Sequence, residues 1–139
     1  MAIALKNIIP AIYTALTGST TLMAKISGVF NEVPQNQNFP YVVIGDSDLT
    51  ETKFNTFGRR GKDTRIYIHI HSLYKGDKEI LDIADEIDVV LDWQDLTVTS
   101  NAHILTSNEG TQILREEDDS KNIKARHGII EYRVLTQES

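Results

Sequence analysis

The feature that most constrains this chain is the strict alternation of the segment RIYIHIHS at positions 65–72. Isoleucine occupies every second position, and the side chains between are those of Arg65, Tyr67, His69 and His71. Because successive side chains of a β-strand point to opposite faces, the segment predicts a strand with one apolar and one polar face. The apolar face must be covered, so we expect a sheet with a second layer on one side.

A helical pattern from Asp77 to Trp93 predicts that second layer. Its apolar residues form one stripe, about 120° wide on a helical wheel. They are Ile80, Ile83, Ala84, Ile87, Val90 and Leu91. The opposite face is predicted to be acidic and to contain Asp82, Asp85, Glu86, Asp88 and Asp92. Carboxylates near a helix C-terminus oppose the macrodipole, which hints that this face meets a partner.

The remaining elements are read from periodicity and from turn residues. A helix is predicted at 8–17, and a shorter helix begins at Ser19 or Thr20 and runs through Ile26. Strands are predicted at 29–33, 41–49, 96–99, 103–107, 112–116 and 126–135, with a turn at 118–122. The order favours an α+β fold, an antiparallel or mixed β-sheet packed on one face by two or three helices. The length of 139 residues predicts a single domain over 1–139.

Composition excludes several classes of function. The chain has no cysteine, so it has no disulfide, thiol nucleophile or cysteine-ligated metal. Its net charge is −6, the opposite of what phosphate binding requires, so specific DNA binding is not expected. The N-terminus lacks the pattern of a signal peptide, and no apolar run is long enough to cross a bilayer. These features predict a protein that stays in the cytosol of its cell and contacts no membrane.

The segment YVVIGDS at positions 41–47 raises the possibility of a catalytic serine. In one class of lipases and esterases, a strand followed by Gly-Asp-Ser leads into a helix and presents the nucleophile. Here the residues after Ser47 alternate as in a strand, and the late His127 is preceded by Lys124 where the triad would need an aspartate. We therefore expect Gly45 to Ser47 to be part of a continuing strand, and the chain not to be an enzyme.

His69 and His71 share one face of a predicted strand, which is the spacing that a metal site needs. His127 on a late strand is a candidate third ligand. The alternative is that these imidazoles belong to a half-exposed sheet face. No carboxylate stands at a matching position, so no metal or other cofactor is expected.

Two surfaces are candidates for contacts with other subunits. The segment FNTFGRRGKD is predicted to be a flexible loop that exposes two aromatic and two arginine side chains, which are typical of interfaces. These are Phe54, Phe57, Arg59 and Arg60. The acidic face of the predicted helix adds Leu81 and Val89, which are apolar groups among charges.

The order of these segments resembles that of the tail-completion, or tail-terminator, proteins of long-tailed bacteriophages. The resemblance spans nearly the whole chain. It rests most on Pro-Tyr-Val-Val-Ile-Gly at 40–45, Ile-His-Ile-His-Ser at 68–72 and His127-Gly128 at the start of the last strand. Where that family often has a tryptophan after the Ile-His-Val run, this chain has His71.

The resemblance implies a structural virion protein that is assembled in the host cytoplasm. It would form a hexameric ring at the head-proximal end of the tail tube, end tube polymerisation and join the tail to the head connector. Its partners would be copies of itself, the tube protein and the connector, and DNA would pass through without specific binding. An acidic channel surface is then expected at Glu116, Glu117, Asp118 and Asp119.

Two alternatives remain open at this point. One is another ring protein of the same particle, involved in head completion or similar to the tail tube. The other is a small hydrolase that uses Ser47 or the histidines.

Overall fold

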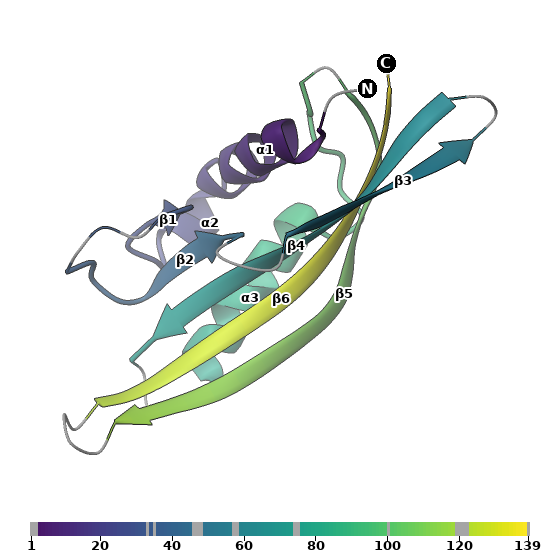
Figure 1. The fold of residues 1–139 in the computed structure, drawn as a ribbon. Coiled ribbons are helices and arrows are strands. Elements are labelled where there is room, and N and C mark those ends of the chain that lie inside the picture. Colours follow the sequence, from purple (N-terminus) through teal and green to yellow (C-terminus); the bar gives the residue numbers. More distant parts are fainter. Residues whose placement is uncertain are drawn as a thin grey trace.

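The computed structural model describes residues 3–138 except 33, 35, 46–48, 57–58, 74–75, 100 and 119–122. At 55, 56, 59, 101, 116–118, 123, 124 and 138 it describes the backbone alone. Its elements, shown in Figure 1, are α1 (Leu5–Thr17), α2 (Thr20–Met23), β1 (Val29–Phe30), β2 (Tyr41–Ile44), β3 (Thr50–Thr56), β4 (Arg59–Ser72), α3 (Lys78–Leu91), β5 (Asn101–Asp118) and β6 (Ile123–Glu138).

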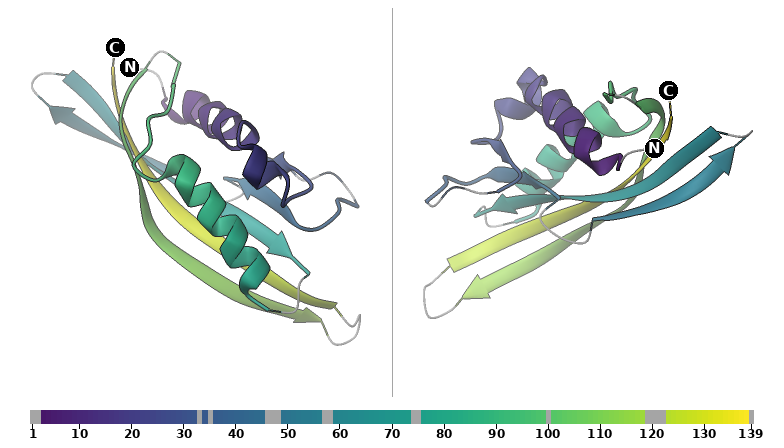
Figure 2. Two further views of the ribbon diagram at one scale, coloured as in Figure 1. Left: turned by 180° about the vertical axis from the view of Figure 1, so that it is seen from behind. Right: turned by 45° about the horizontal axis from the view of Figure 1, so that its top comes forward.

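The described strands form one mixed, six-stranded sheet. Its order is β1-β2-β4-β6-β5, and β3 pairs with β4 beyond the end of β2. The β1/β2 pair is parallel, and the other pairs are antiparallel. The helices lie together on one face of this sheet (Figure 2). The α+β architecture predicted from the sequence is therefore confirmed.

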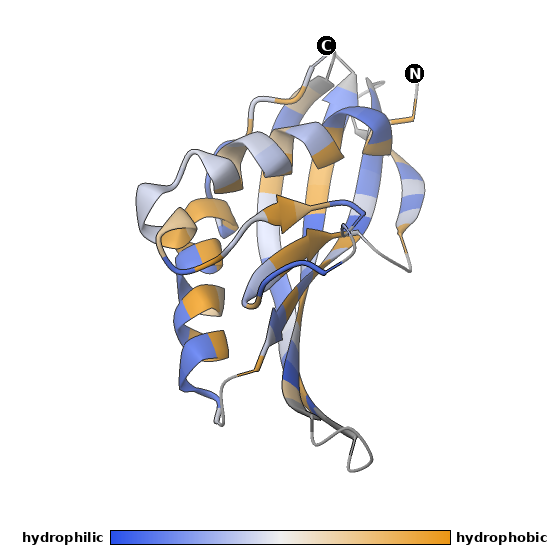
Figure 3. Ribbon diagram, turned by 90° about the vertical axis from the view of Figure 1, so that its left-hand side faces the viewer, coloured by the Kyte–Doolittle hydropathy of each residue, from blue (hydrophilic) through white to orange (hydrophobic). Residues whose placement is uncertain are grey.

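The core lies between the helices and that face of the sheet. Ile66, Ile68 and Ile70 of β4 are fully buried, as their alternation predicted. They meet the buried stripe of α3, which includes Ile80, Ile83, Ala84, Ile87 and Leu91. In Figure 3 the orange, hydrophobic parts of the α3 ribbon lie on its side toward the sheet. None of the helices in the described residues is long and apolar enough to span a membrane.

The first helix begins at Leu5, three positions before the predicted start. Ala4, Ile8, Ile12 and Leu16 recur every fourth residue and are fully buried, which extends the helix toward the N-terminus. Asn7, a residue type that often caps helices, lies inside this helix, and Pro10 is in its second turn. The backbone N–H of Leu5 instead donates to the Glu51 carboxylate at 3.0 Å. The cap is thus supplied from β3, which local sequence could not show.

The short elements at the N-terminal end are smaller than predicted. The second helix ends at Met23 and the first strand at Phe30. The Ser19 hydroxyl does cap α2, because it accepts the N–H of Leu22 at 3.3 Å. The β2 strand ends at Ile44 and does not continue to position 49, since Gly45 turns the chain with a φ of +64°. The prediction of one continuous strand through Gly45 is therefore wrong.

The C-terminal strands are longer than the sequence indicates. Three separate strands were predicted between 96 and 116, but β5 is one strand over Asn101–Asp118, and 96–99 lies outside it. Register shifts between His103 and Leu105 and between Asn108 and Gly110 disturb its alternation. Such irregularities insert one extra residue, so the side chains that follow it point to the opposite faces of the sheet. The sequence of β5 therefore does not alternate regularly between apolar and polar residues. The last strand begins at Ile123 and ends at Glu138.

Two hairpins extend beyond the helical layer at opposite ends of the sheet. The β3–β4 hairpin projects past the N-terminus of α1, and the β5–β6 hairpin projects past the start of α3 (Figures 1 and 2). The segment predicted to be a flexible loop over 54–63 is mostly paired strand, in which Phe54 faces Gly61 and Asn55 faces Arg60. That prediction is wrong because pairing along β4 continues almost to the turn.

Candidate functional site

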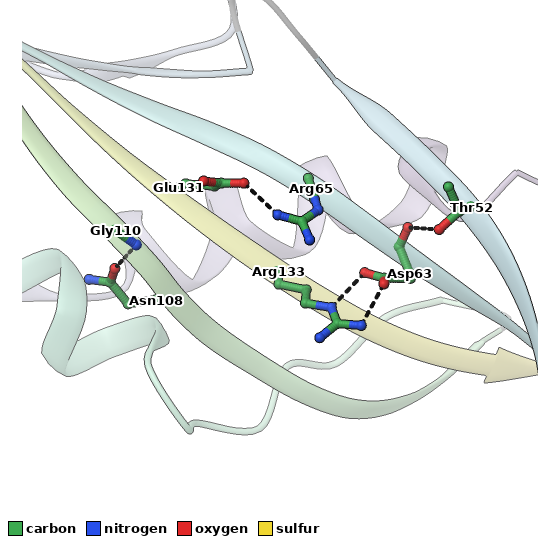
Figure 4. A network of polar contacts seen from close by, with 7 residues as sticks. All are labelled: Thr52, Asp63, Arg65, Asn108, Gly110, Glu131 and Arg133. Carbon is green, nitrogen blue, oxygen red and sulfur yellow. Dashed lines mark hydrogen bonds and ion pairs between the residues drawn. The ribbon is translucent and has the colours of Figure 1, made fainter.

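The face of the sheet away from the helices, here called the open face, carries cross-strand ion pairs (Figure 4). Arg133 donates to both carboxylate oxygens of Asp63, at 2.9 and 2.6 Å, and Arg65 donates to Glu131 at 2.8 Å. The hydrogen bond from Arg133 lowers the pKa of Asp63 despite partial burial. The pKa of Arg65 is raised, chiefly by its hydrogen bond to Glu131. These groups hold β4 to β6.

The open face also brings the predicted histidines together. His69 is buried, with 6% of its surface exposed. Its Nδ1 lies 2.8 Å from Nε2 of His127. His71 stacks on His127 with ring centroids 4.4 Å apart, and Tyr41 stacks on the other side of His71 at 5.0 Å. Tyr41 of β2, His71 of β4 and His127 of β6 thus form a stacked row, and His69 joins it through His127.

This row does not have the geometry of a metal site. A metal ion needs ring nitrogens that converge on one point, but His71 and His127 face each other with an interplanar angle of 17°. The Nε2 of His127 is engaged by His69. Within the part of the chain that the structure describes, no group of three histidine, aspartate or glutamate side chains could hold a metal.

The candidate serine, Ser47, lies outside the described residues. Its flanks are described, and they differ from those of a hydrolase nucleophile. The preceding strand ends at Ile44, and the next element is the strand β3 over Thr50–Thr56. A nucleophile of that class is held at a sharp turn from a strand into a helix. The described flanks therefore lack the helix that this geometry requires.

Three clefts of the described surface contain none of the candidate catalytic residues. The first, of about 310 Å³, lies between Lys25 and the first turns of α3. The second, of about 360 Å³, lies between α1 and the segment 95–99. The third, of about 220 Å³, lies on the open face beside Tyr67 and Glu131. The described residues that line these clefts include no histidine or serine, so none of the three clefts contains the serine-histidine pair of the hydrolase alternative.

His103, in β5, has a structural role. Its Nδ1 accepts the backbone N–H of Leu96 at 3.5 Å, and its Nε2 lies 2.6 Å from the Thr106 hydroxyl. Burial lowers the pKa of His103, although the nearby Asp95 acts in the opposite direction. The neutral ring therefore links the segment after α3 to β5.

The acidic residues of α3 divide into two groups. Asp88 was predicted on the outer face but turns to the sheet, where it accepts from the Tyr132 hydroxyl at 2.8 Å and the Asn108 amide at 2.9 Å. Asp92 likewise accepts the N–H of Asn108 at 2.8 Å. The prediction is wrong for both residues, because the edge of the helix faces polar groups of β5 and β6. The pKa of the Tyr132 hydroxyl is raised, chiefly by burial and also by its hydrogen bond to Asp88.

Two of the other acidic residues remain on the outside. Asp82 and Asp85 are exposed. Leu81 and Val89 lie beside them with 51% and 64% of their surface exposed. These four residues are called the outer face of α3 below. Exposed apolar side chains among charges are typical of interaction surfaces. The exposure of Leu81 and Val89 is consistent with the subunit interface predicted for them, which stays a prediction.

An exposed tryptophan at the end of α3 was missed by the sequence reasoning. Trp93 was predicted in the helix, but it follows its end, with a φ of +57° and 72% of its surface exposed. The backbone N–H of Trp93 donates to the backbone carbonyl of Thr106 at 2.8 Å, which turns the chain toward β5. Tryptophan is usually largely buried, so nothing local marked this one as a surface residue.

The predicted interface residues of the β3–β4 hairpin are separated by the pairing of its strands. Phe54 is half-buried, and its ring lies where a Cβ on Gly61 would be, at 2.4 Å. Phe54 was predicted to be exposed and is only partly so, because Gly61 leaves room for the ring. Arg60 is exposed. Phe57 lies outside the described residues, and the structure describes only the backbone of Arg59.

The acidic residues predicted to line a channel lie at the far end of the β5–β6 hairpin. Glu116, Glu117 and Asp118 pair through their backbones with Ala125, Lys124 and Ile123. Their side chains and the whole of Asp119 lie outside the described structure. The channel surface stays a prediction.

Comparison with known proteins identifies the family. The model of the family described as "Tail completion protein gp17" matches residues 10–137. The chain belongs to this bacteriophage family. A search of curated proteins found no match to this tail completion protein.

Two solved structures resemble the fold of the tail completion protein. One is a chain of the virion of the native gene transfer agent (GTA) particle, with a TM-score of 0.82, 16% identity and 99% of both chains covered. The other is the gp17 protein of bacteriophage SPP1, with a TM-score of 0.62, 19% identity and coverage of 96% and 95%. At these identities the likeness establishes the shared fold.

Proposed function

We propose that this chain is a structural, non-enzymatic component of a phage virion, located between head and tail. Copies of it form a hexameric ring on the head-proximal end of the tail tube. The ring ends polymerisation of the tube protein and presents a docking surface to the head connector. Assembly takes place in the cytoplasm of the bacterial host, and no membrane is involved. The family match over residues 10–137 carries this proposal.

The surfaces of the molecule are suited to such a role. A closed ring needs two different contact surfaces on each subunit, one for each neighbour. The β3–β4 hairpin, with Arg60, and the outer face of α3, with Leu81 and Val89, are two such surfaces on different elements. The predicted contacts of Phe54, Phe57 and Arg59 would add to the first of these.

The charge of the chain suits a passage for DNA. At a net charge of −6, the protein repels the phosphate backbone, so DNA can move past without being held. Glu116 to Asp119 would place carboxylates of the β5–β6 hairpin at the channel wall.

Electron microscopy of a phage that carries a stop codon at position 13 tests the proposal. We expect unjoined or overlong tails beside DNA-filled, tailless heads, because nothing would cap the tube or connect it. A plasmid copy of the wild-type gene should restore joined particles. Tails of normal length joined to heads in the absence of the protein would refute the proposed role.

A further inference from the structure

The helix-side face of the sheet continues past the end of the helices into the β3–β4 hairpin. Alternate residues of a strand share a face, so Ile66, Thr64, Lys62 and Arg60 follow one another on the helix side of β4. Thr64 is fully buried and Lys62 is 8% exposed, whereas Arg60 is exposed. The cover given by the helices therefore ends between Lys62 and Arg60.

The partner strand shows the same boundary. Glu51 lies opposite Thr64 and is buried against the N-terminus of α1, with 9% of its side chain exposed. Lys53 lies opposite Lys62, so it is on the same face, and it is exposed. Lys53 and Arg60 thus form a basic, uncovered part of the helix-side face, called the overhang below. In two views the hairpin extends away from α1 and α3 (Figures 1 and 2).

The outer face of α3 has the complementary properties. Asp82 and Asp85 are three residues apart, so they lie on one side of the helix, and the last turn of α3 contains no basic residue. Leu81 and Val89, exposed beside them, would be covered by a partner. Over the middle of this sheet the helix-side face is covered by helices, so a helix is a fitting cover for the overhang as well.

We propose that the overhang of each subunit receives the outer face of α3 of the next copy of this chain. Lys53 and Arg60 then face Asp82 and Asp85, and the neighbour's helix completes the layer that ends at α1. The contact is head-to-tail, since the two surfaces lie on different elements, and such contacts close into a ring when the rotation between subunits permits. Complementary charges set the register of the contact more than its strength. This inference rests on the proposed ring.

The absence of native cysteine makes cross-linking a direct test. The variant Lys53→Cys with Asp85→Cys would be supplied to the stop-codon phage, and purified particles treated with a short bis-maleimide. We expect a ladder of covalent multimers of this chain, because each subunit would be linked to the next. Each single-cysteine variant should stay monomeric. No multimer from the double variant, in joined particles that contain the protein, would overturn the contact and leave the proposed function intact.

A second cysteine pair tests whether the overhang contacts a different surface of the next copy. Glu109 is an exposed acidic residue of β5. If Lys53→Cys with Glu109→Cys gave the ladder and the Asp85 pair did not, the overhang would contact β5 and the inference would be wrong. Particles that join normally without any copy of the chain would refute the proposed function itself, and the contact with it.

Charge reversal provides an independent readout. We expect Lys53→Glu with Arg60→Glu to lower the yield of infectious particles about tenfold or more, and Asp82→Lys with Asp85→Lys to do the same. The chain that combines all four changes should recover most of the yield, because the charges are again opposite. A combined variant no better than its parents would count against the pairing.

Discussion

Glu51 joins three elements through one carboxylate. One oxygen accepts the N–H of Leu5 at the start of α1, and the other lies 3.4 Å from Nζ of Lys62 in β4. Both side chains are 9% exposed, so neither charge is well hydrated. A nearly buried pair of this kind depends on both partners, since removing one leaves the other charge uncompensated.

Substitution of Lys62 tests this dependence. Lys62→Met should lower the free energy of unfolding by about 3 kcal/mol, because Glu51 would remain buried without its counter-charge. Adding Glu51→Gln should recover much of the loss, since an amide oxygen can still accept the N–H of Leu5. Urea denaturation of the single and double variants measures both values. Additive losses in the double variant would show that the pair does not act as a unit.

His103 makes stability depend on pH. In the unfolded chain its pKa is near the ordinary 6.5, and in the folded chain burial lowers it. As the pH falls through 6.5, the unfolded state therefore binds the proton before the folded state does, and stability decreases. We expect His103→Gln to lose less stability than the wild type between about pH 7.5 and 5.5, measured by thermal or urea unfolding. Equal losses in both proteins would show that His103 is not the source of the dependence.

The helix α3 is fastened to the sheet through carboxylates at both ends. Near its start, Glu79 accepts from the Ser72 hydroxyl at 2.7 Å, and Asp77 pairs with Arg126 at 3.3 Å. Near its end, Asp88 accepts from Tyr132 and Asn108. An acidic helix is thus held by hydrogen bonds to its charges as well as by its apolar stripe.

Removal of the Tyr132 hydroxyl tests the attachment at the C-terminal end. Tyr132 is fully buried, so Tyr132→Phe should cost about 1.5 to 3 kcal/mol, the range for a hydrogen bond to a charged acceptor. Tyr13→Phe is the matched control, because that ring is half-exposed, and it should change stability by less than about 0.5 kcal/mol. Denaturant unfolding compares the two. Similar small effects would mean that Asp88 is satisfied without Tyr132.

At the scale of the whole molecule, folding and assembly should be separable. Phe57→Ser with Arg60→Glu changes the end of the β3–β4 hairpin, beyond the helical layer, so we expect a cooperatively folded monomer that fails to join heads to tails. Thermal unfolding and electron microscopy of complemented phage measure the two properties. Glu32→Lys, a reversal at an exposed position after β1, is the control and should assemble. Normal joining of heads to tails by the double variant would show that the tip of the hairpin is not part of the interface.

The sequence by itself determined which faces are buried. The alternation at 65–72 placed Ile66, Ile68 and Ile70 in the core, and the helical period placed Ile80, Ile83 and Ile87 opposite them. The same signals predicted an antiparallel or mixed sheet with helices on one face, and the order of segments pointed to the family. These properties follow from short-range periodicity, because the side-chain directions of strands and helices repeat every few residues.

Only the tertiary structure decided the contacts that join distant segments. His69 and His127 are 58 positions apart, and their contact depends on the register of β4 against β6. Glu51 and Leu5 are 46 positions apart, and Asp88 and Tyr132, which are joined by a hydrogen bond, are 44 positions apart. No local period encodes such partners, since a shift of register by one residue would place each side chain on the other face. The end of the helical layer at Lys62, which leaves the overhang uncovered, likewise follows from how the elements pack.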